Sequence, residues 1–351
     1  MKNNALKNPV MRIGFFSDSY FPGIDGVTYT LESWKQRLEE RGHEVYIIYP
    51  ESDDYEPSER EIPVRSVQNP FYPGYNIPLP TSLDFPELDI VHCHSPAMIG
   101  WAGKLYSVRN NVPAVYTHHT PVEEYFEQAV PGKVASLLKR LYVPMEERFL
   151  STFDKVITNT EEGRRDIETV KLDAGVDMRF FQPVETEKEG TVIGYSGRAS
   201  SEKNLDKVVE MSKEVDTKLI IVGEGPAREK VEADAPENVE FKDFLDREKL
   251  PEYYSMLDVF VTASTGDTLG LSPLEANACG TPVVAPDTHP FDKTVGDGNG
   301  YTYRLDDIED FRKKVRKAID AEWDTRKSVE KYSLETSIDR IEEIYADLEV
   351  E

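Results

Sequence analysis

The sequence is poor in cysteine, since Cys93 and Cys279 are its only two thiols in 351 residues. Two thiols this far apart fit neither a zinc motif nor a disulfide framework, so they indicate a reducing compartment and hence the cytoplasm. Long apolar runs are missing as well, because no stretch approaches the roughly 20 apolar residues of a membrane span. Residues 1–10 lack the apolar core of a secretory signal, and we expect them to form a flexible leader.

Basic residues are outnumbered, because 41 Lys and Arg stand against 66 Asp and Glu and leave a net charge of −25. This excess argues against a nucleic-acid-binding protein. The acids are spread over the whole chain, which is typical of a solvated acidic surface and suits a halophilic protein kept soluble at high salt. Hydrophobic residues still make up 39% of the chain, enough for sizeable cores, and the length predicts two domains.

Short apolar runs alternate with stretches of helical periodicity in both halves of the chain. The alternation predicts an α/β protein with two doubly wound, Rossmann-like domains. We expect a first domain over 11–178, a linker over 179–190, a second domain over 191–330, and a closing helix over 331–351 with an apolar stripe that docks elsewhere on the protein. The predicted strands are 11–16, 44–49, 88–94, 112–119, 153–160, 191–196, 217–222, 238–241, 257–262 and 281–285.

Two acids flank a glycine turn that follows a predicted strand of the second domain. Ser272, Pro273 and Glu275 match a capping box with proline at the first helical position, so Glu275 can be explained as a helix cap. The backbone N–H groups around Gly270 also precede a helix, an arrangement that attracts phosphate. A solvated loop position would account for Asp267. The structural and the functional explanation both stay open at this point.

The segment "YSGRASSEKN" closes another strand of the second domain. Arg198 could neutralise a diphosphate through its fork of donors and Lys203 as a point charge, although a solvated loop also explains them. Further on, "VGEGPAREK" does not match a dinucleotide-binding fingerprint, because Arg228 occupies the third glycine position. Gly225 could lie near a nucleotide base or ribose, or mark a plain tight turn.

Four of the six histidines lie at the ends of two predicted strands of the first domain. A zinc site would need a third ligand whose geometry the sequence does not supply. His92 fits a core position, whereas His94 and His119 are candidates for polar contact with a substrate. Gly26 precedes the first helix and could approach a phosphate.

Residues 131–150, "PGKVASLLKRLYVPMEERFL", combine an apolar stripe with the cations Lys133, Lys139 and Arg140. In so acidic a chain, this amphipathic helix could lie on an anionic membrane surface. A half-buried helix whose cations extend to solvent is the alternative.

Taken in their order along the chain, the segments quoted in this section resemble the family 4 retaining glycosyltransferases of the GT-B fold. The resemblance covers nearly the whole chain and implies two Rossmann-like domains facing across a deep cleft. It also implies an acceptor-side first domain, a nucleotide-sugar-binding second domain, and a C-terminal helix that crosses back to the first. The stretch "VYTHHTPVEEYFEQAVPGK" is most similar to the lipid-directed branch, such as the diacylglycerol glucosyltransferases. The remaining motifs are "FFSDSYFPGIDGVTYT", "DIVHCHSP", "AGVDMRFFQP", "GRASSEKN", "VGEGPAREK" and "DTLGLSPLEANACGTPVVA".

The resemblance further implies roles for the matching positions, with His119 beside the transferred sugar and no metal required. Its catalytic residues would be His119, Arg198, Lys203 and Asp267. The donor would be bound by Gly26, Gly197, Arg198, Lys203, Gly225, Asp267, Thr268, Leu269, Gly270, Leu271 and Glu275. Acceptor or membrane contacts would come from His94, Glu124, Tyr125, Lys133, Lys139 and Arg140. Asp267 departs from the family, which usually has the longer Glu there.

The function implied by the resemblance is retaining transfer of a hexose, glucose from UDP-glucose, to a membrane lipid of the diacylglycerol type. The enzyme would work in the cytoplasm or as a peripheral protein on the inner face of the cell membrane. Three alternatives stay open: transfer from a UDP- or GDP-sugar to a growing glycan, a sugar-nucleotide epimerase, and a non-catalytic nucleotide-sugar-binding protein. A Rossmann dehydrogenase is disfavoured, because no G-x-G-x-x-G follows the first strand.

Overall fold

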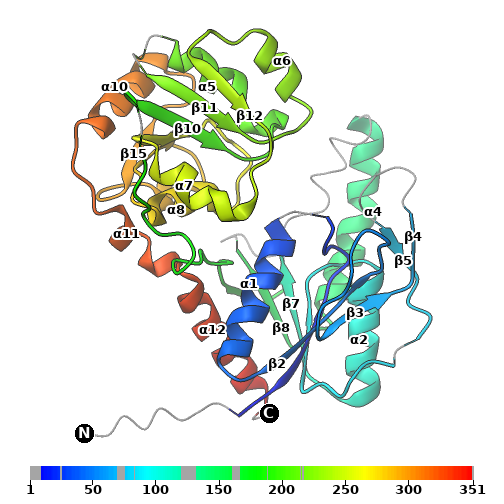
Figure 1. Ribbon diagram of the computed structural model, residues 1–351. Coiled ribbons are helices and arrows are strands. Elements are labelled where there is room, and N and C mark those ends of the chain that lie inside the picture. Colours follow the sequence, from blue (N-terminus) through cyan, green and yellow to red (C-terminus); the bar gives the residue numbers. More distant parts are fainter. Residues whose placement is uncertain are drawn as a thin grey trace, which may run out of the picture. The chain divides into compact units, whose positions relative to one another are not determined.

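The chain folds into two compact units (Figure 1). Unit 1 comprises Met1–Ala174 and Ser337–Glu351, and unit 2 comprises Gly175–Thr336. The structure is a computed structural model, which describes residues 9–23, 26–68, 76–82, 84–119, 132–159, 167–187, 189–213, 215 and 217–349.

Unit 1 is built on a seven-stranded parallel sheet with the order β3-β2-β1-β6-β7-β8-β9. Every residue of β6 and β7 is buried, as expected for interior parallel strands covered on both faces. The helices that surround the sheet include α1 (Gly26–Glu40), α2 (Met98–Asn110) and α4 (Gly132–Leu150). The strands are β1 (Arg12–Phe16), β2 (Glu44–Pro50), β3 (Glu61–Val64), β6 (Ile90–Cys93), β7 (Ala114–His118), β8 (Lys155–Thr158) and β9 (Thr169–Lys171), and a separate hairpin pairs β4 (Ser66–Gln68) with β5 (Asn76–Pro78).

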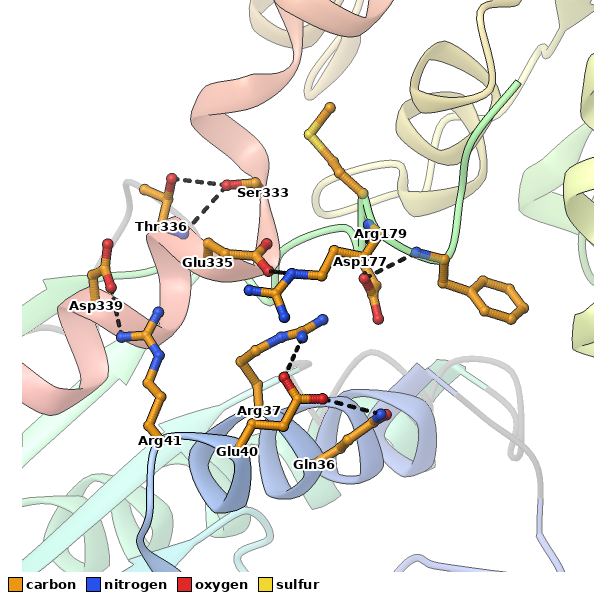
Figure 2. A network of polar contacts seen from close by, with 12 residues as sticks. Gln36, Arg37, Glu40, Arg41, Asp177, Arg179, Ser333, Glu335, Thr336 and Asp339 are labelled. Atoms are coloured by element: carbon orange, nitrogen blue, oxygen red, sulfur yellow. Dashed lines mark hydrogen bonds and ion pairs between the residues drawn. The ribbon is translucent and has the colours of Figure 1, made fainter. Parts of the chain in front are cut away.

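The C-terminal helix α12 (Leu334–Glu349) belongs to unit 1 from Ser337 onward. Its apolar stripe is fully buried at Ile338, Ile341 and Tyr345. On its polar side, Arg41 reaches the carboxylate of Asp339 at 2.6 Å (Figure 2). The prediction that the closing helix docks on the first domain is therefore confirmed, and burial of this stripe is what holds it there.

Unit 2 contains a six-stranded parallel sheet with the order β12-β11-β10-β13-β14-β15. Its strands are β10 (Val192–Ser196), β11 (Lys218–Val222), β12 (Val239–Lys242), β13 (Val259–Val261), β14 (Val283–Pro286) and β15 (Gly300–Tyr303). Its helices are α5 (Leu205–Ser212), α6 (Arg228–Ala233), α7 (Leu250–Ser255), α8 (Leu271–Ala278), α9 (Phe291–Thr294), α10 (Ile308–Ile319) and α11 (Thr325–Ser328).

The segment predicted as a linker, 179–190, falls within unit 2. Arg326 explains this, because its guanidinium donates hydrogen bonds to the backbone oxygens of Met178, Phe181 and Ala278. Arg179 also pairs with Glu335 at 2.8 Å, within the same unit (Figure 2). The exact limits of the domains stay a prediction.

Each predicted strand is present. The short strands β3, β4, β5, β9 and β15 were not predicted from the sequence. In both sheets the order reverses beside the first strand, so β1 lies between β2 and β6, and β10 lies between β11 and β13. Loops leaving the two strands at such a point diverge, and doubly wound proteins bind their ligands there. Within the described residues, none of the helices has both the length and the apolar character needed to span a membrane.

Candidate active site

The loops that follow β10 and β13 leave neighbouring strands at the reversal point of unit 2. The first loop continues into a 3₁₀ turn, Ser201–Lys203, and the second runs into α8. Two backbone-directed hydrogen bonds join them, because Thr265 N donates to the oxygen of Glu202 at 2.9 Å and Asn204 Nδ2 donates to the oxygen of Ala263 at 3.0 Å. Residues far apart in the chain are thereby assembled into one site.

Lys203 and Asp267 form an ion pair between these loops, with 2.8 Å between Nζ and Oδ1. Their side chains are only 16% and 24% exposed, so the pair is shielded better than one on the open surface. Asp267 is therefore part of an organised polar cluster, and the reading of it as a solvated loop acid is wrong.

Gly197 and Gly225 have backbone conformations that only glycine adopts easily, with φ of 148° and 149°. A Cβ on Gly225 would lie 2.5 Å from the carbonyl oxygen of Ala199. Ala199 N also donates to the oxygen of Glu224 at 2.8 Å, which packs the loops after β10 and β11 together. This close packing accounts for Gly225 as a tight turn, and Arg198 lies within the same loop.

Helix α8 begins in a different way from the capping box that the sequence suggested. Gly270 is the N-cap in the left-handed conformation, with φ 77° and ψ 65°, and the first helical residue is Leu271. Glu275 does not cap the helix but accepts a hydrogen bond from the Tyr254 hydroxyl at 2.9 Å. The capping explanation is wrong, because the turn at Gly270 starts the helix before Ser272.

The start of α8 is not capped by a side chain. Gly270 has no side chain to cap the helix, and the first N–H groups of any helix have no acceptor within it. The helix dipole adds partial positive charge at this end. Thr268 and Leu269 lead into the turn, directly after Asp267.

Glu275 is half-buried, and this burial raises the pKa of its carboxyl against the opposing effects of the Tyr254 hydrogen bond and of Arg247. The Tyr254 hydroxyl also lies 2.8 Å from Oγ of Ser196, at the end of β10. Tyr254 thus fixes the carboxylate relative to the sheet.

The polar cluster of unit 1 consists of three histidines at the ends of β6 and β7. Nδ1 of His94 lies 3.0 Å from Nε2 of His119. His92 is fully buried between the Tyr345 hydroxyl and Oγ1 of Thr117, both at 2.6 Å, as expected of a core residue. Burial holds the pKa of both His92 and His94 well below the usual value of 6.5, so both are neutral at pH 7.

The other predicted positions of unit 1 are distributed over the helices. Gly26 is the exposed first residue of α1, and a Cβ there would meet no atom within 4 Å. Lys133, Lys139 and Arg140 lie on α4. Glu124 and Tyr125 lie outside the described residues. Among the residues that the structure does describe, no three His, Cys, Asp or Glu side chains are grouped to hold a metal ion.

Two family models match consecutive parts of the chain. "Glycosyltransferase Family 4" matches residues 24–176, and "Glycosyl transferases group 1" matches residues 177–336. The chain belongs to the family 4 glycosyltransferases. It is therefore a hexosyltransferase, and enzymes of this kind use nucleotide-sugar donors.

Among curated proteins, this glycosyltransferase is similar to two alpha-monoglucosyldiacylglycerol synthases. The one from Streptococcus pneumoniae is 28% identical over 78% of this chain and 71% of its own, and the one from Acholeplasma laidlawii is 27% identical over 82% and 83%. A GDP-mannose-dependent alpha-mannosyltransferase from Mycolicibacterium smegmatis is 28% identical over 79% of this chain and 80% of its own.

Solved structures confirm the GT-B fold of the glycosyltransferase. The sucrose-phosphate synthase from Thermosynechococcus elongatus aligns with a TM-score of 0.72 at 18% identity, over 97% of this chain and 99% of that one. Anabaena Alr3699/HepE in complex with UDP and glucose aligns with a TM-score of 0.69 at 17% identity, over 96% and 100%.

Sequence reasoning missed two polar residues of the glycosyltransferase. Asp18, directly after β1, accepts hydrogen bonds from Oγ of Ser95 and from the backbone N–H of Ile99, so it caps α2 at the reversal point of unit 1. Its position behind the first strand was a usable signal. Tyr254 has no such signal, because its partner Glu275 is distant in the chain.

Gly270→Ala should destabilise the protein. A Cβ at this position would lie 2.7 Å from the Phe291 ring, and the left-handed conformation adds about 1–2 kcal/mol. We expect the free energy of unfolding, measured with urea, to fall by at least that amount. Gly296→Ala is the matched control, because a Cβ there meets nothing within 4 Å. Equal stability of the two variants would contradict the role given to Gly270.

Proposed function

We propose that this glycosyltransferase moves glucose from UDP-glucose to a diacylglycerol-type membrane lipid with retention of configuration. The assignment of the donor rests on the polar cluster at the reversal point of unit 2. There the Lys203–Asp267 pair lies close in sequence to the start of α8, which no side chain caps. The assignment of a lipid acceptor is supported by the two glucosyldiacylglycerol synthases that resemble the chain over most of its length.

The chemical step breaks the bond between the anomeric carbon and the diphosphate oxygen. Negative charge grows on the leaving oxygen, and Lys203, Arg198 and the N–H groups at the start of α8 would stabilise it. The acceptor hydroxyl bonds to the anomeric carbon on the face that the phosphate leaves, and its proton passes to the departing phosphate. Asp267 would contact hydroxyls of the donor sugar, which favours this single displacement over a covalent intermediate on that carboxylate.

The remaining donor contacts are proposed from the resemblance to the family. Glu275 would hold the ribose hydroxyls, and the Tyr254 hydrogen bond would keep its carboxylate in place. The residues 268–271 would contact sugar and phosphate, and His119 a sugar hydroxyl. No step of this transfer requires a metal. GDP-mannose is the second candidate donor, because GDP-mannose-dependent mannosyltransferases are also among the similar proteins.

Peripheral membrane contact would bring the enzyme to its lipid. Helix α4 exposes an apolar stripe, and α2 in the same unit exposes a second one. The α2 stripe consists of Met98, Trp101, Leu105 and Val108, which are 48%, 47%, 56% and 67% exposed, and the α4 stripe of Val134, Leu137, Leu141 and Met145, which are 46%, 57%, 66% and 53% exposed.

The charges on these two helices fit an anionic surface. Helix α2 carries Lys104 and Arg109 and no acid. Helix α4 carries four cations and two acids, and one of the acids, Glu146, is buried. A basic, apolar surface within a chain of net charge −25 is what peripheral binding to anionic lipids requires. The acidic charge elsewhere would keep the protein soluble at high salt.

The donor and acceptor are tested together by incubating the protein with UDP-glucose, UDP-galactose or GDP-mannose. Each donor is offered with diacylglycerol vesicles, with oligosaccharides, or alone. We expect nucleotide release and an α-linked glucolipid with UDP-glucose and vesicles only. Nucleotide release with oligosaccharides and not with vesicles would establish the glycan alternative. An altered donor sugar in the absence of acceptor would establish the epimerase. No turnover in any mixture would establish the non-catalytic nucleotide-sugar-binding protein.

Lys203→Ala should lower the turnover of the donor at least tenfold, because one charge that stabilises the leaving phosphate is lost (a tenfold change corresponds to about 1.4 kcal/mol). Lys207→Ala is the control, since this lysine of α5 pairs with Asp306 instead. Initial rates of nucleotide release at saturating acceptor measure the effect. Near-normal turnover of Lys203→Ala would remove this residue from the donor site.

Charge reversal on α4 tests the membrane contact. The triple variant Lys133→Glu, Lys139→Glu, Arg140→Glu should lose flotation with vesicles that contain phosphatidylglycerol. The unaltered protein should float with these vesicles and not with pure phosphatidylcholine. A control triple variant reverses exposed lysines of unit 2, at Lys213, Lys230 and Lys327. If both triple variants float alike, α4 is not the contact.

A further inference from the structure

His94 is held between two other histidines in unit 1. Its ring stacks on His92 at 4.2 Å between centroids and on His119 at 5.2 Å, with interplanar angles of 29° and 25°. Phe15 and Trp34 pack against it edge-to-face at 4.9 and 5.8 Å. Only 4% of His94 is exposed, so its ring has a single well-defined orientation.

The two nitrogens of His94 have different surroundings. Nδ1 lies 3.0 Å from Nε2 of His119. Nε2 is buried and has no hydrogen-bond partner among the residues that the structure describes. By contrast, both nitrogens of His92 have partners, Tyr345 and Thr117.

From this geometry we propose that His94 is a positioning residue. Its Nδ1–H donates a hydrogen bond to Nε2 of His119. This hydrogen bond holds His119 in the tautomer that carries its proton on Nδ1. The role of this tautomer in the reaction rests on the proposed function, whereas the tautomer itself does not.

Two neutral imidazoles can share this contact in two ways. If Nε2 of His119 donated, His94 would carry its proton on Nε2, and a buried N–H would lack an acceptor. If Nδ1 of His94 donates, only a lone pair of Nε2 is left without a partner. Buried N–H groups without acceptors are rarer in proteins than acceptors without donors, because their desolvation is not compensated. The second arrangement is therefore favoured.

Burial restricts His94 to its neutral forms. It keeps the pKa of His94 well below 6.5, and the neighbouring His92 and His119 act in the same direction. With one proton, His94 donates from one nitrogen only. The Nδ1–H of His94 is thereby committed to His119.

The tautomer of His119 limits which hydrogen bonds this residue can make. A neutral imidazole that accepts at Nε2 can only donate at Nδ1. His119 would therefore donate a hydrogen bond to a hydroxyl of the transferred sugar and would not act as a general base. This agrees with the proposed reaction, in which the departing phosphate takes the proton of the acceptor.

The tautomer can be read directly by long-range ¹H–¹⁵N correlation on the full-length, ¹⁵N-labelled protein at pH 7, because the two neutral forms have different nitrogen shifts. His119→Gln assigns the signals. We expect the Nδ1-protonated pattern for His119 and its loss in His94→Leu. An Nε2-protonated His119 in the unaltered protein, with the N–H of His94 directed at an aromatic ring, would overturn the proposal.

Activity provides a second measurement. His94→Leu should lower kcat roughly tenfold, the upper range for one lost hydrogen bond, whereas His94→Asn keeps a donor near the position of Nδ1 and should recover most of it. Tyr345→Phe removes the hydrogen bond to His92 only and should change kcat less than twofold. Equal losses in the Leu and Asn variants would refute the positioning role. If His94→Leu does not fold, the spectrum of the unaltered protein and the Asn variant still decide.

Discussion

The polarity of the strands is the constraint on which the rest of this molecule depends. Because all strands of each main sheet run parallel, their carboxyl ends meet at one edge, and the order reverses beside the first strand. That reversal places the loop after β10 next to the loop after β13 and so brings Lys203 to Asp267. In unit 1 the same geometry brings Asp18 to Ser95. The polar residues are thus gathered by topology, and helix packing supplies the apolar support behind them.

Burial then decides the chemical state of the gathered groups. It disfavours charge, so it keeps His92 and His94 neutral and raises the pKa of Glu275. Each of these residues is held by a tyrosine or by another histidine. Each cluster therefore consists of groups of fixed orientation, and the cluster of unit 2 also retains charges, among them the Lys203 ammonium. Preorganised dipoles and few charges are well suited to the stabilisation of a leaving phosphate.

Much of the fold could be predicted from the sequence, because buried parallel strands appear as uninterrupted apolar runs and α12 as an apolar stripe. The short strands β9 and β15 lack an uninterrupted apolar run, so they give no such signal. The site was harder to predict. The prediction that Glu275 caps α8 is wrong, because the left-handed turn at Gly270 is a backbone property that the capping pattern does not encode. The contacts of Lys203 with Asp267 and of Tyr254 with Glu275 span 64 and 21 residues of chain, so only the strand order reveals them.

Under the proposed function, the Lys203–Asp267 pair also determines what the arriving donor encounters. The ammonium is already neutralised by the carboxylate at 2.8 Å, so an incoming phosphate must replace one anion by another. The free energy of such an exchange is the difference between two ion pairs, which is much smaller than either pair alone. Simple anions gain little from it. Under the proposed function, a donor that also offers hydroxyls to the released carboxylate would compensate for both lost contacts, so the pair would select molecules in which a phosphate and a sugar are joined.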